Sequence, residues 1–433
     1  MGGIFGIVSS KRCVEDLVLG TSYLQHRNHD YCGVGLKNGG ELRDYTHAGL
    51  IKTIFTKNYL DSLEGNWGVG AVSNYRQPTS EFSKFGGAIL CFDGRISNSD
   101  FLKNKLLNRG ASFSGYRSPE QVSDNLLISK IISNEPSFEK GIEKLTNVME
   151  GDFAILSLAQ EGIYVSRGWG RKPLVLGKRE EDYAVSSESN SFENTGFEIV
   201  RDVEPGETVL LNEKGICSLA KLDLSPIKYG TFEWIYSAYP PSVIQGRCVA
   251  DVRFNIGEIL AKKYPINADV VSPLPNSGRW PALGYAKESG ISYEEVFVRY
   301  DYSDRSFTSS KQEVRDKEAK VKLIPLKSRI QGRKIVLVDD SIVRGTQMWN
   351  RVLRLKALGA KEVHARIACP PLKAACRYGY SIKENEDCIA TRMDLNSILK
   401  KLNLDSLRYA TVEALEEAIG FSREKLCLEC WEL

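Results

Sequence analysis

The order of apolar and polar positions divides the chain into two parts with different patterns. From Gly3 to about Leu222, short apolar segments with frequent glycine predict antiparallel strands that are covered on one face. These segments are Gly3–Val8, Trp67–Val72, Gly87–Phe92, Phe153–Leu158 and Ile163–Ser166. Helix-like stretches lie between them, at Val14–Leu24 and Gln121–Ile132. The mixture predicts an α+β domain in which helices face stacked sheets.

Beyond a proline-bearing hinge at residues 222–227, helices alternate with strands of parallel type. The predicted order is helix Arg253–Lys263, strand Ala268–Leu274, helix Trp280–Ser289, strand Glu294–Arg299, strand Ile335–Val338, helix Trp349–Leu358 and strand Glu362–Cys369. This alternation is typical of a doubly wound α/β domain. We therefore expect a first domain at residues 1–226 and a second at 227–433.

Composition narrows the classes of partner. The 433 residues include 58 Lys and Arg against 55 Asp and Glu, so charge gives no argument for a nucleic-acid or membrane surface. No apolar run approaches the roughly 20 residues of a membrane-spanning helix. The N-terminal residues lack the basic segment of a signal peptide. We expect a cytoplasmic protein without nucleic-acid or membrane partners.

One stretch of the second domain carries recognisable chemistry. The apolar strand Ile335–Val338 ends in Asp339 and Asp340, and Ser341, Gly345 and Thr346 follow before the next helix. Ligands of open α/β sheets bind at the carboxyl ends of strands, and a helix N-terminus attracts phosphate. The two acids would then hold sugar hydroxyls or Mg²⁺. An ordinary strand–turn–helix with two solvated acids is the alternative, but the order of residues is similar to the phosphoribosyl diphosphate (PRPP) loop of type I phosphoribosyltransferases.

Nearly the whole chain resembles the amidophosphoribosyltransferase family. The motifs that carry this resemblance are Gly3–Ile7, His26-Arg27, Ser123-Asp124, Arg171–Leu174, Ser187–Ser189, Tyr239-Pro240, Pro275–Gly278 and Asp339–Thr346. The resemblance implies an α+β N-terminal Ntn-hydrolase-like αββα sandwich, which is a glutaminase, plus an α/β type I phosphoribosyltransferase domain. It also implies purine synthesis, PRPP as substrate, Mg²⁺ as cofactor and a homo-oligomer.

The glutaminase half departs from the family pattern at three positions. Gly2 stands where the family has its nucleophilic N-terminal Cys, and Asp93 of the Asp93-Gly94 pair stands where an Asn stabilises the oxyanion. Ser73 replaces the Arg that holds the glutamine carboxylate, while Arg27 and Asp124 remain at matching positions. An active site with relocated groups is one reading. A degenerate site retained as scaffold is the one that we favour, because each loss is chemically severe.

The resemblance also assigns roles in the phosphoribosyltransferase half. The predicted catalytic residues are Arg305, Asp339 and Asp340, and the same two acids are the expected metal ligands. The predicted PRPP-binding residues are Ser277, Arg299, Asp339, Asp340, Ser341, Val343, Arg344, Gly345 and Thr346. The charged loop with Gln312, Arg315 and Lys320 is expected to close over pyrophosphate. The family pattern is not kept at Asp301, Asn276 and the run Gln347–Trp349. The acceptor or the mode of PRPP binding can therefore differ from that of the family.

The cysteines leave the question of an iron–sulfur cluster open. Cys427 and Cys430 have the spacing of a metal site, and with Cys376 they match three of the four ligands of a [4Fe–4S] cluster in some family members. The fourth position is Gly230, so water or a substitute such as Cys369 or Cys248 would have to bind the last iron. A cluster, a zinc site or unligated thiols all remain open. We expect phosphoribosyl transfer to ammonia, free or supplied by a partner, or to another amine, without the protein's own glutaminase activity. The alternative is a non-catalytic PRPP-sensing or scaffold subunit.

Overall fold

The computed structural model describes residues 2–113, 118, 121–300, 323–379 and 384–432. The chain forms two compact units, and each takes residues from more than one stretch. Unit 1 contains Met1–Gly230, Ala238–Gly246 and Arg377–Ser381, and unit 2 contains Thr231–Ser237, Arg247–Cys376 and Ile382–Leu433. Two short excursions of the chain therefore complete unit 1 from within the second half of the sequence.

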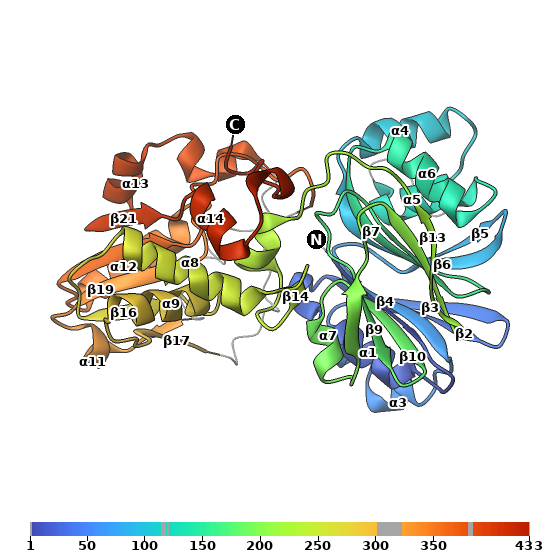
Figure 1. The fold of residues 1–433 in the computed structure, drawn as a ribbon, viewed down its shortest axis with the longest axis horizontal. Coiled ribbons are helices and arrows are strands. Elements are labelled where there is room, and N and C mark those ends of the chain that lie inside the picture. The colour runs from blue at the N-terminus through green and yellow to red at the C-terminus, as the bar shows by residue number, and fades with distance from the viewer. Residues whose placement is uncertain (1, 114–117, 119–120, 301–322, 380–383, 433) are drawn as a thin grey trace. The chain divides into compact units, whose positions relative to one another are not determined.

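Unit 1 is built on two antiparallel sheets (Figure 1). The seven-stranded sheet has the order β11-β9-β10-β1-β4-β2-β3, and the six-stranded sheet has the order β13-β12-β8-β7-β6-β5. The strands are β1 (Gly3–Val8), β2 (Tyr31–Asn38), β3 (Glu41–Ala48), β4 (Trp67–Ser73), β5 (Thr79–Ser83), β6 (Gly86–Ile96), β7 (Gly151–Leu158), β8 (Ile163–Arg167), β9 (Val175–Arg179), β10 (Asp182–Ser186), β11 (Glu198–Asp202), β12 (Glu207–Asn212) and β13 (Gly215–Lys221).

Helices cover both outer faces of this pair of sheets. The α-helices of unit 1 are α1 (Val14–Ser22), α2 (Ile51–Ile54), α3 (Lys57–Leu60), α4 (Ser99–Leu107), α5 (Asp124–Ser133), α6 (Phe138–Val148) and α7 (Asn190–Glu193), with a 3-10 turn η1 (Gln25–Arg27). Leu17 of α1 shares a core with Phe5 and Val34 of the seven-stranded sheet. Leu127 of α5 and Leu145 of α6 share another with the six-stranded sheet. The layers therefore follow the predicted αββα order.

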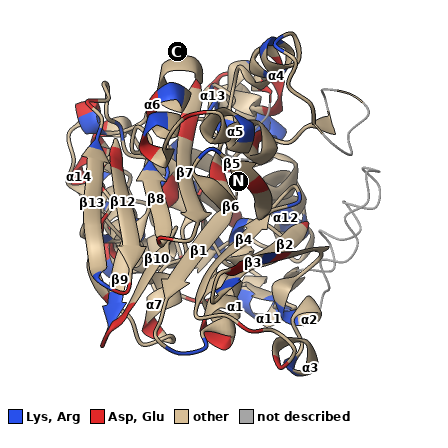
Figure 2. Cartoon of the chain, turned by 90° about the vertical axis from the view of Figure 1, so that its right-hand side faces the viewer, with Lys and Arg blue, Asp and Glu red and all other residues tan. Residues whose placement is uncertain are grey.

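The core between the two sheets explains the pattern of apolar segments in this half of the sequence. Ile4, Val69, Leu156 and Val165 belong to one buried cluster drawn from both sheets. Every residue of β1 is buried, because its second face packs against α1. Strands β7, β8 and β12 accordingly carry few charged residues along their length, and many Lys, Arg, Asp and Glu lie on helices such as α4 and α6 (Figure 2). Burial on both faces accounts for the short continuous apolar runs.

Unit 2 is an α/β fold around a four-stranded parallel sheet of order β16-β19-β20-β21. The remaining strands of the chain form this sheet and two short two-stranded ribbons. They are β14 (Val243–Ile244), β15 (Arg247–Cys248), β16 (Val270–Pro273), β17 (Phe297–Arg299), β18 (Leu323–Pro325), β19 (Lys334–Asp339), β20 (Glu362–Ile367) and β21 (Ser406–Tyr409). Strand β14 belongs to the stretch Ala238–Gly246 of unit 1. The helices are η3 (Glu233–Ser237), α8 (Val249–Lys263), α9 (Arg279–Ser289), α11 (Lys327–Ile330), α12 (Thr346–Ala357), η4 (Asn385–Asp387), η5 (Ile389–Thr391), α13 (Leu395–Lys401), α14 (Val412–Ile419) and η6 (Arg423–Lys425). Within the described residues, no helix is long and apolar enough to cross a membrane.

One predicted strand has a different partner from the one expected. The segment Glu294–Arg299 is predicted to join the parallel sheet. Its first residue does contact β16, since the Glu294 amide donates to the Val271 carbonyl beside a parallel bridge between Val271 and Tyr293, but β17 itself pairs antiparallel with β18 in a separate ribbon. Val298 of this strand is 42% exposed and lies opposite Ile324, which is 49% exposed. A central parallel strand is buried on both faces, whereas this ribbon is not. The apolar pattern was correct for a strand but did not determine its neighbours.

Candidate functional site

The acid pair of the predicted PRPP loop lies at the carboxyl end of β19. This strand runs between β16 and β20, and its residues Ile335 to Val338 are completely buried. Asp339 Oδ1 accepts hydrogen bonds from the Asp340 amide (2.9 Å) and from Ser277 Oγ (3.3 Å). Ser341 Oγ donates to Asp340 Oδ2 at 2.5 Å. Both acids are thus oriented by neighbouring hydroxyl groups at the sheet edge where ligands bind.

Gly345 shapes the loop that follows. Its φ of +79° is left-handed, and a Cβ at this position would lie 3.1 Å from Ile389 Cδ1 and 3.2 Å from Leu402 Cδ2. Helix α12 begins directly afterwards, so its positive end faces the loop. A cavity of about 450 Å³ adjoins the loop, and its lining residues are Arg344, Gly345, Thr346, Trp349, Lys401 and Leu402. The arrangement suits a phosphate group at the helix N-terminus.

Burial and like charge perturb the acid pair. They raise the pKa of Asp339 well above its ordinary range, first because the carboxyl group is buried and second because Asp340 is adjacent. A cation that reaches the pair would displace the retained proton. No group of three His, Cys, Asp or Glu side chains in the described part of the chain could hold a metal ion by itself. Two carboxylates nevertheless fit Mg²⁺, which binds through one or two acids together with substrate phosphates.

The other predicted PRPP residues are only partly gathered here. Ser277 follows a cis peptide bond between Pro275 and Asn276 and reaches Asp339. Arg344 is turned to Asp387, with its Nη2 2.6 Å from Oδ1, and Val343 contributes a carbonyl to Ile389. Arg299 ends β17, in the separate ribbon. Arg305, Gln312, Arg315 and Lys320 lie outside the described residues.

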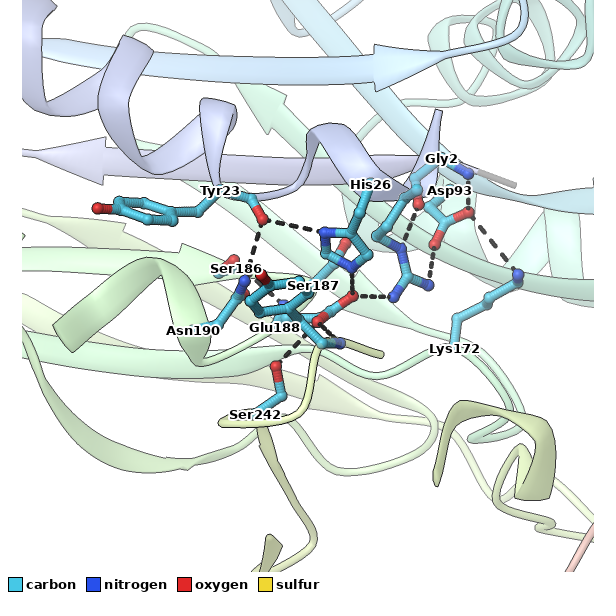
Figure 3. A network of polar contacts seen from close by, with 12 residues as sticks. Gly2, Tyr23, His26, Asp93, Lys172, Ser186, Ser187, Glu188, Asn190 and Ser242 are labelled. Carbon is cyan, nitrogen blue, oxygen red and sulfur yellow. Dashed lines mark hydrogen bonds and ion pairs between the residues drawn. The ribbon is translucent and has the colours of Figure 1, made fainter. Parts of the chain in front are cut away.

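In unit 1, two of the three positions that depart from the glutaminase pattern, Gly2 and Asp93, belong to a buried ion network (Figure 3). Asp93 Oδ1 accepts a hydrogen bond from the Gly2 amide (2.8 Å), and Lys172 Nζ lies 3.7 Å from it. Arg27 bridges the centre, because its Nη2 contacts Asp93 Oδ2 at 3.3 Å while its Nε donates to the Gly2 carbonyl at 2.6 Å. Burial opposes ionisation, but Lys172 and Arg27 lower the pKa of Asp93 overall. Asp93 is therefore a carboxylate at neutral pH.

Glu188 is a central residue of this network whose role the sequence did not predict, although it lies in the motif Ser187–Ser189. Its Oε1 lies 2.5 Å from Arg27 Nη1 and 2.8 Å from His26 Nε2, while Oε2 accepts from the Tyr239 amide (2.7 Å) and Ser242 Oγ (2.8 Å). Burial would raise the pKa of Glu188, but His26 and Arg27 hold it far below its usual range. The only sequence signal was an acid between two serines, since its partners are distant along the chain.

The remaining glutaminase positions are engaged by the chain itself. Ser73 Oγ donates to the Tyr75 carbonyl at 2.5 Å, and Asp124 accepts from Ser99 Oγ (2.7 Å) and the Ile96 amide (3.2 Å). Gly94 leaves no space for a side chain, since a Cβ would lie 2.3 Å from the Asp152 carbonyl oxygen. Arg27 and Asp124 thus remain in place, but both hold protein groups.

The cysteines of the proposed cluster lie close to one another in unit 2. A hydrogen bond with Cys376, followed by burial and by the charges of Cys376, Cys427 and Cys369, raises the pKa of Cys430 far above its usual range. The Lys373 amide donates to the Cys430 carbonyl at 2.8 Å. Gly230 brings no ligand, and the described residues contain no metal-holding group of three. Cys376, Cys427 and Cys369 thus lie near Cys430, so the structure groups the three predicted cysteines with a fourth thiol.

Sequence comparison relates this chain to a known domain and to known enzymes. Residues 67–194 match the model of a glutamine amidotransferase domain. The amidophosphoribosyltransferase of Methanocaldococcus jannaschii is 35% identical over 99% of this chain and 96% of that protein, and the one of Methanothermobacter thermautotrophicus is 35% identical over 99% and 93%.

The fold comparison agrees with the sequence comparison. The glutamine PRPP amidotransferase of B. subtilis, complexed with ADP and GMP, superposes with a TM-score of 0.92 at 30% identity, covering 99% of this chain and 96% of that chain. This likeness confirms the predicted fold class of both halves. The chain therefore belongs to the amidophosphoribosyltransferase family.

Proposed function

We propose that this protein transfers the phosphoribosyl group of PRPP to ammonia or to another small amine, with Mg²⁺ and release of pyrophosphate, and without hydrolysing glutamine itself. One contrast supports the proposal. The acid pair and the phosphate loop of unit 2 are assembled, whereas in unit 1 the Asp93 carboxylate stands where an oxyanion would need a hydrogen-bond donor. Relatives named amidophosphoribosyltransferase make an enzyme of this class the expected one.

The residues of unit 2 would act chiefly by positioning. Asp339 and Asp340 would hold the ribose hydroxyls, while the amides of the loop and the N-terminus of α12 would hold the 5′-phosphate. Mg²⁺ would supply charge neutralisation on the pyrophosphate as it departs. Ser277, at 3.3 Å from Asp339, would keep that carboxylate in position as its charge changes. Such fixed charges stabilise an oxocarbenium-like sugar, and the reaction with an amine needs no nucleophilic side chain of the protein.

Three features of unit 1 argue against glutamine hydrolysis. Gly2 has no side-chain nucleophile, and a Cβ there would lie 3.0 Å from the Val72 carbonyl oxygen. The negative charge of Asp93 would repel a tetrahedral oxyanion. Ser73 is too short to pair with the carboxylate of glutamine, and its hydroxyl is already bonded to Tyr75. An external ammonia source, such as a partner protein, is therefore part of the proposal, as is a homo-oligomer.

Pyrophosphate release from PRPP and Mg²⁺ tests the proposal directly. We expect turnover with ammonia or one of a panel of small amines and none with glutamine. Asp339→Asn should abolish turnover, whereas Asp251→Asn, on the exposed side of α8, should leave it unchanged. PRPP binding without turnover with any amine would instead support a PRPP-sensing or scaffold subunit. Glutamate formation from glutamine by the purified protein would refute the loss of glutaminase activity.

A further inference from the structure

An excess of positive charge lies at one edge of the parallel sheet of unit 2. β21 is the edge strand of this sheet (Figure 1). Its parallel register with β20 sets Arg366 directly opposite Arg408. Lys263, in the last turn of α8, adds a third cation. Lys263 Nζ and the Arg408 guanidinium each lie 5.8 Å from the centre of the Tyr264 ring. After burial, the charge of Arg408 is among the influences that lower the pKa of Arg366, so these two like charges act on one another.

Arg366 is buried without an acid to pair with. It is 2% exposed, and its Nη1 donates to the Ala365 carbonyl (3.0 Å) and Ser406 Oγ (3.1 Å). Its Nη2 donates weakly to the Tyr264 carbonyl (3.4 Å), and Nε has no hydrogen-bond partner in the part of the chain that the structure describes. Because Tyr264 ends α8, its carbonyl adds the partial negative charge of a helix terminus, which is about half a unit. The guanidinium also lies 5.9 Å from the centre of the Tyr285 ring, so its charge is offset by a carbonyl and an aromatic ring and not by a carboxylate.

Glu413 lies close enough to Lys263 for the two charges to interact, whereas the acids beside the two arginines are engaged with other residues. Glu362 pairs with Lys334 at 2.8 Å and contacts His364 at 3.1 Å, and Asp405 pairs with Lys356 at 3.2 Å. Among the described residues, neither Arg366 nor Arg408 forms an ion pair. Buried charges in proteins are normally paired, and an exception calls for a bound group.

We propose that Arg366, Arg408 and Lys263 form a binding site for a phosphate-type oxyanion. Arg408 and Lys263 are exposed and would meet the anion first, whereas Arg366, opposite Arg408 in the sheet, is buried. A tetrahedral dianion carries the charge to offset two arginines and enough acceptor atoms for several N–H donors. The site shares no residue with the cavity at the phosphate loop and does not depend on the reaction proposed above.

An anomalous scatterer would locate the anion. In crystals of the full chain soaked with selenate, we expect an anomalous peak within hydrogen-bonding distance of Arg366 and Arg408. Arg408→Gln should remove that peak, and Arg329→Gln, which changes a surface arginine paired with Glu294, should not. Selenate bound only at the phosphate loop would refute the proposal.

Calorimetric titration supplies the solution measurement. Inorganic phosphate should bind at a site that Arg408→Gln weakens by about tenfold, since one charge-assisted contact is lost. PRPP turnover, whose residues lie elsewhere, should be unchanged. Tighter binding of ribose 5-phosphate than of inorganic phosphate, again lost in Arg408→Gln, would support a phosphate ester as the ligand, and equal binding would support the free anion. Unaltered phosphate affinity in Arg408→Gln would overturn the proposal.

Discussion

Replacing Asp93 by asparagine should destabilise unit 1 even though it restores the residue type that a glutaminase uses. Asp93 and Lys172 are completely buried and 3.7 Å apart, so Asp93→Asn leaves a buried ammonium without its carboxylate. Removing one partner of a buried pair costs about 3–5 kcal/mol. Arg27 keeps its 2.5 Å contact with Glu188, and an asparagine oxygen can still accept from the Gly2 amide, so we expect the lower end, about 3 kcal/mol.

Thermal unfolding followed by calorimetry would measure this loss. For a unit of some 240 residues, about 3 kcal/mol corresponds to a decrease in Tm of roughly 6–12 °C. Because the pKa of Asp93 is lowered in the fold, its contribution is complete at neutral pH and disappears only as the pH falls through that lowered pKa. The difference between wild type and variant should therefore shrink in acid.

A double variant separates charge pairing from simple packing. Asp93→Asn combined with Lys172→Met removes both charges, and it should recover at least about 1 kcal/mol relative to the sum of the single changes. Asp44→Asn, at an exposed position of β3, serves as the matched control. A loss below about 1 kcal/mol in Asp93→Asn would refute the conclusion that this carboxylate is an ionised counter-charge.

Three further outcomes are expected. Gly2→Cys alone should give no glutaminase activity, because Asp93 and Ser73 remain; glutamate production measured by a coupled assay would contradict this. Binding of PRPP with Mg²⁺ should strengthen as pH rises and should release protons, because the raised pKa of Asp339 leaves a proton on the carboxyl group that the bound cation displaces. Calorimetry in buffers of different ionisation enthalpy would measure this proton release. An affinity that does not change with pH would contradict the prediction. Gly345→Ala should raise the KM for PRPP several-fold, because φ of +79° costs an alanine about 1 kcal/mol and its Cβ would press on Ile389 and Leu402; an unchanged KM would show that the loop tolerates the strain.

Local sequence patterns predicted where strands form better than they predicted which strands pair with one another. The buried run Ile335–Val338 and the acids after it were visible because a central parallel strand needs a continuous apolar segment. The antiparallel pairing of β17 was not visible, because a strand of three residues has the same local pattern in either sheet. Register and partners depend on contacts that the local pattern does not encode.

The candidate sites show the same limit. Asp339, Asp340 and Ser341 are adjacent in sequence, so their proximity followed from the motif. The role of Glu188 was not predicted, because its partners His26 and Ser242 lie 162 and 54 residues away. The ion pair between Asp93 and Lys172 likewise joins β6 to a loop beyond β8. A charged residue surrounded by small ones gives no sign of the carboxylate or guanidinium that it will meet after folding.

The two excursions of the chain into unit 1 have a consequence for how such a protein can change. Glu188 holds the stretch Ala238–Gly246 through Tyr239 and Ser242, and Arg171 lies 3.9 Å from the ring centre of Tyr378 in the second stretch. Both stretches lie in sequence beyond the start of unit 2, so no single cut divides the gene into two folding parts. A deletion of the N-terminal half would leave two loops of the second half without the surface on which they fold. A lineage that gave up glutamine hydrolysis could therefore discard the catalytic side chains one at a time, but not the fold that carried them.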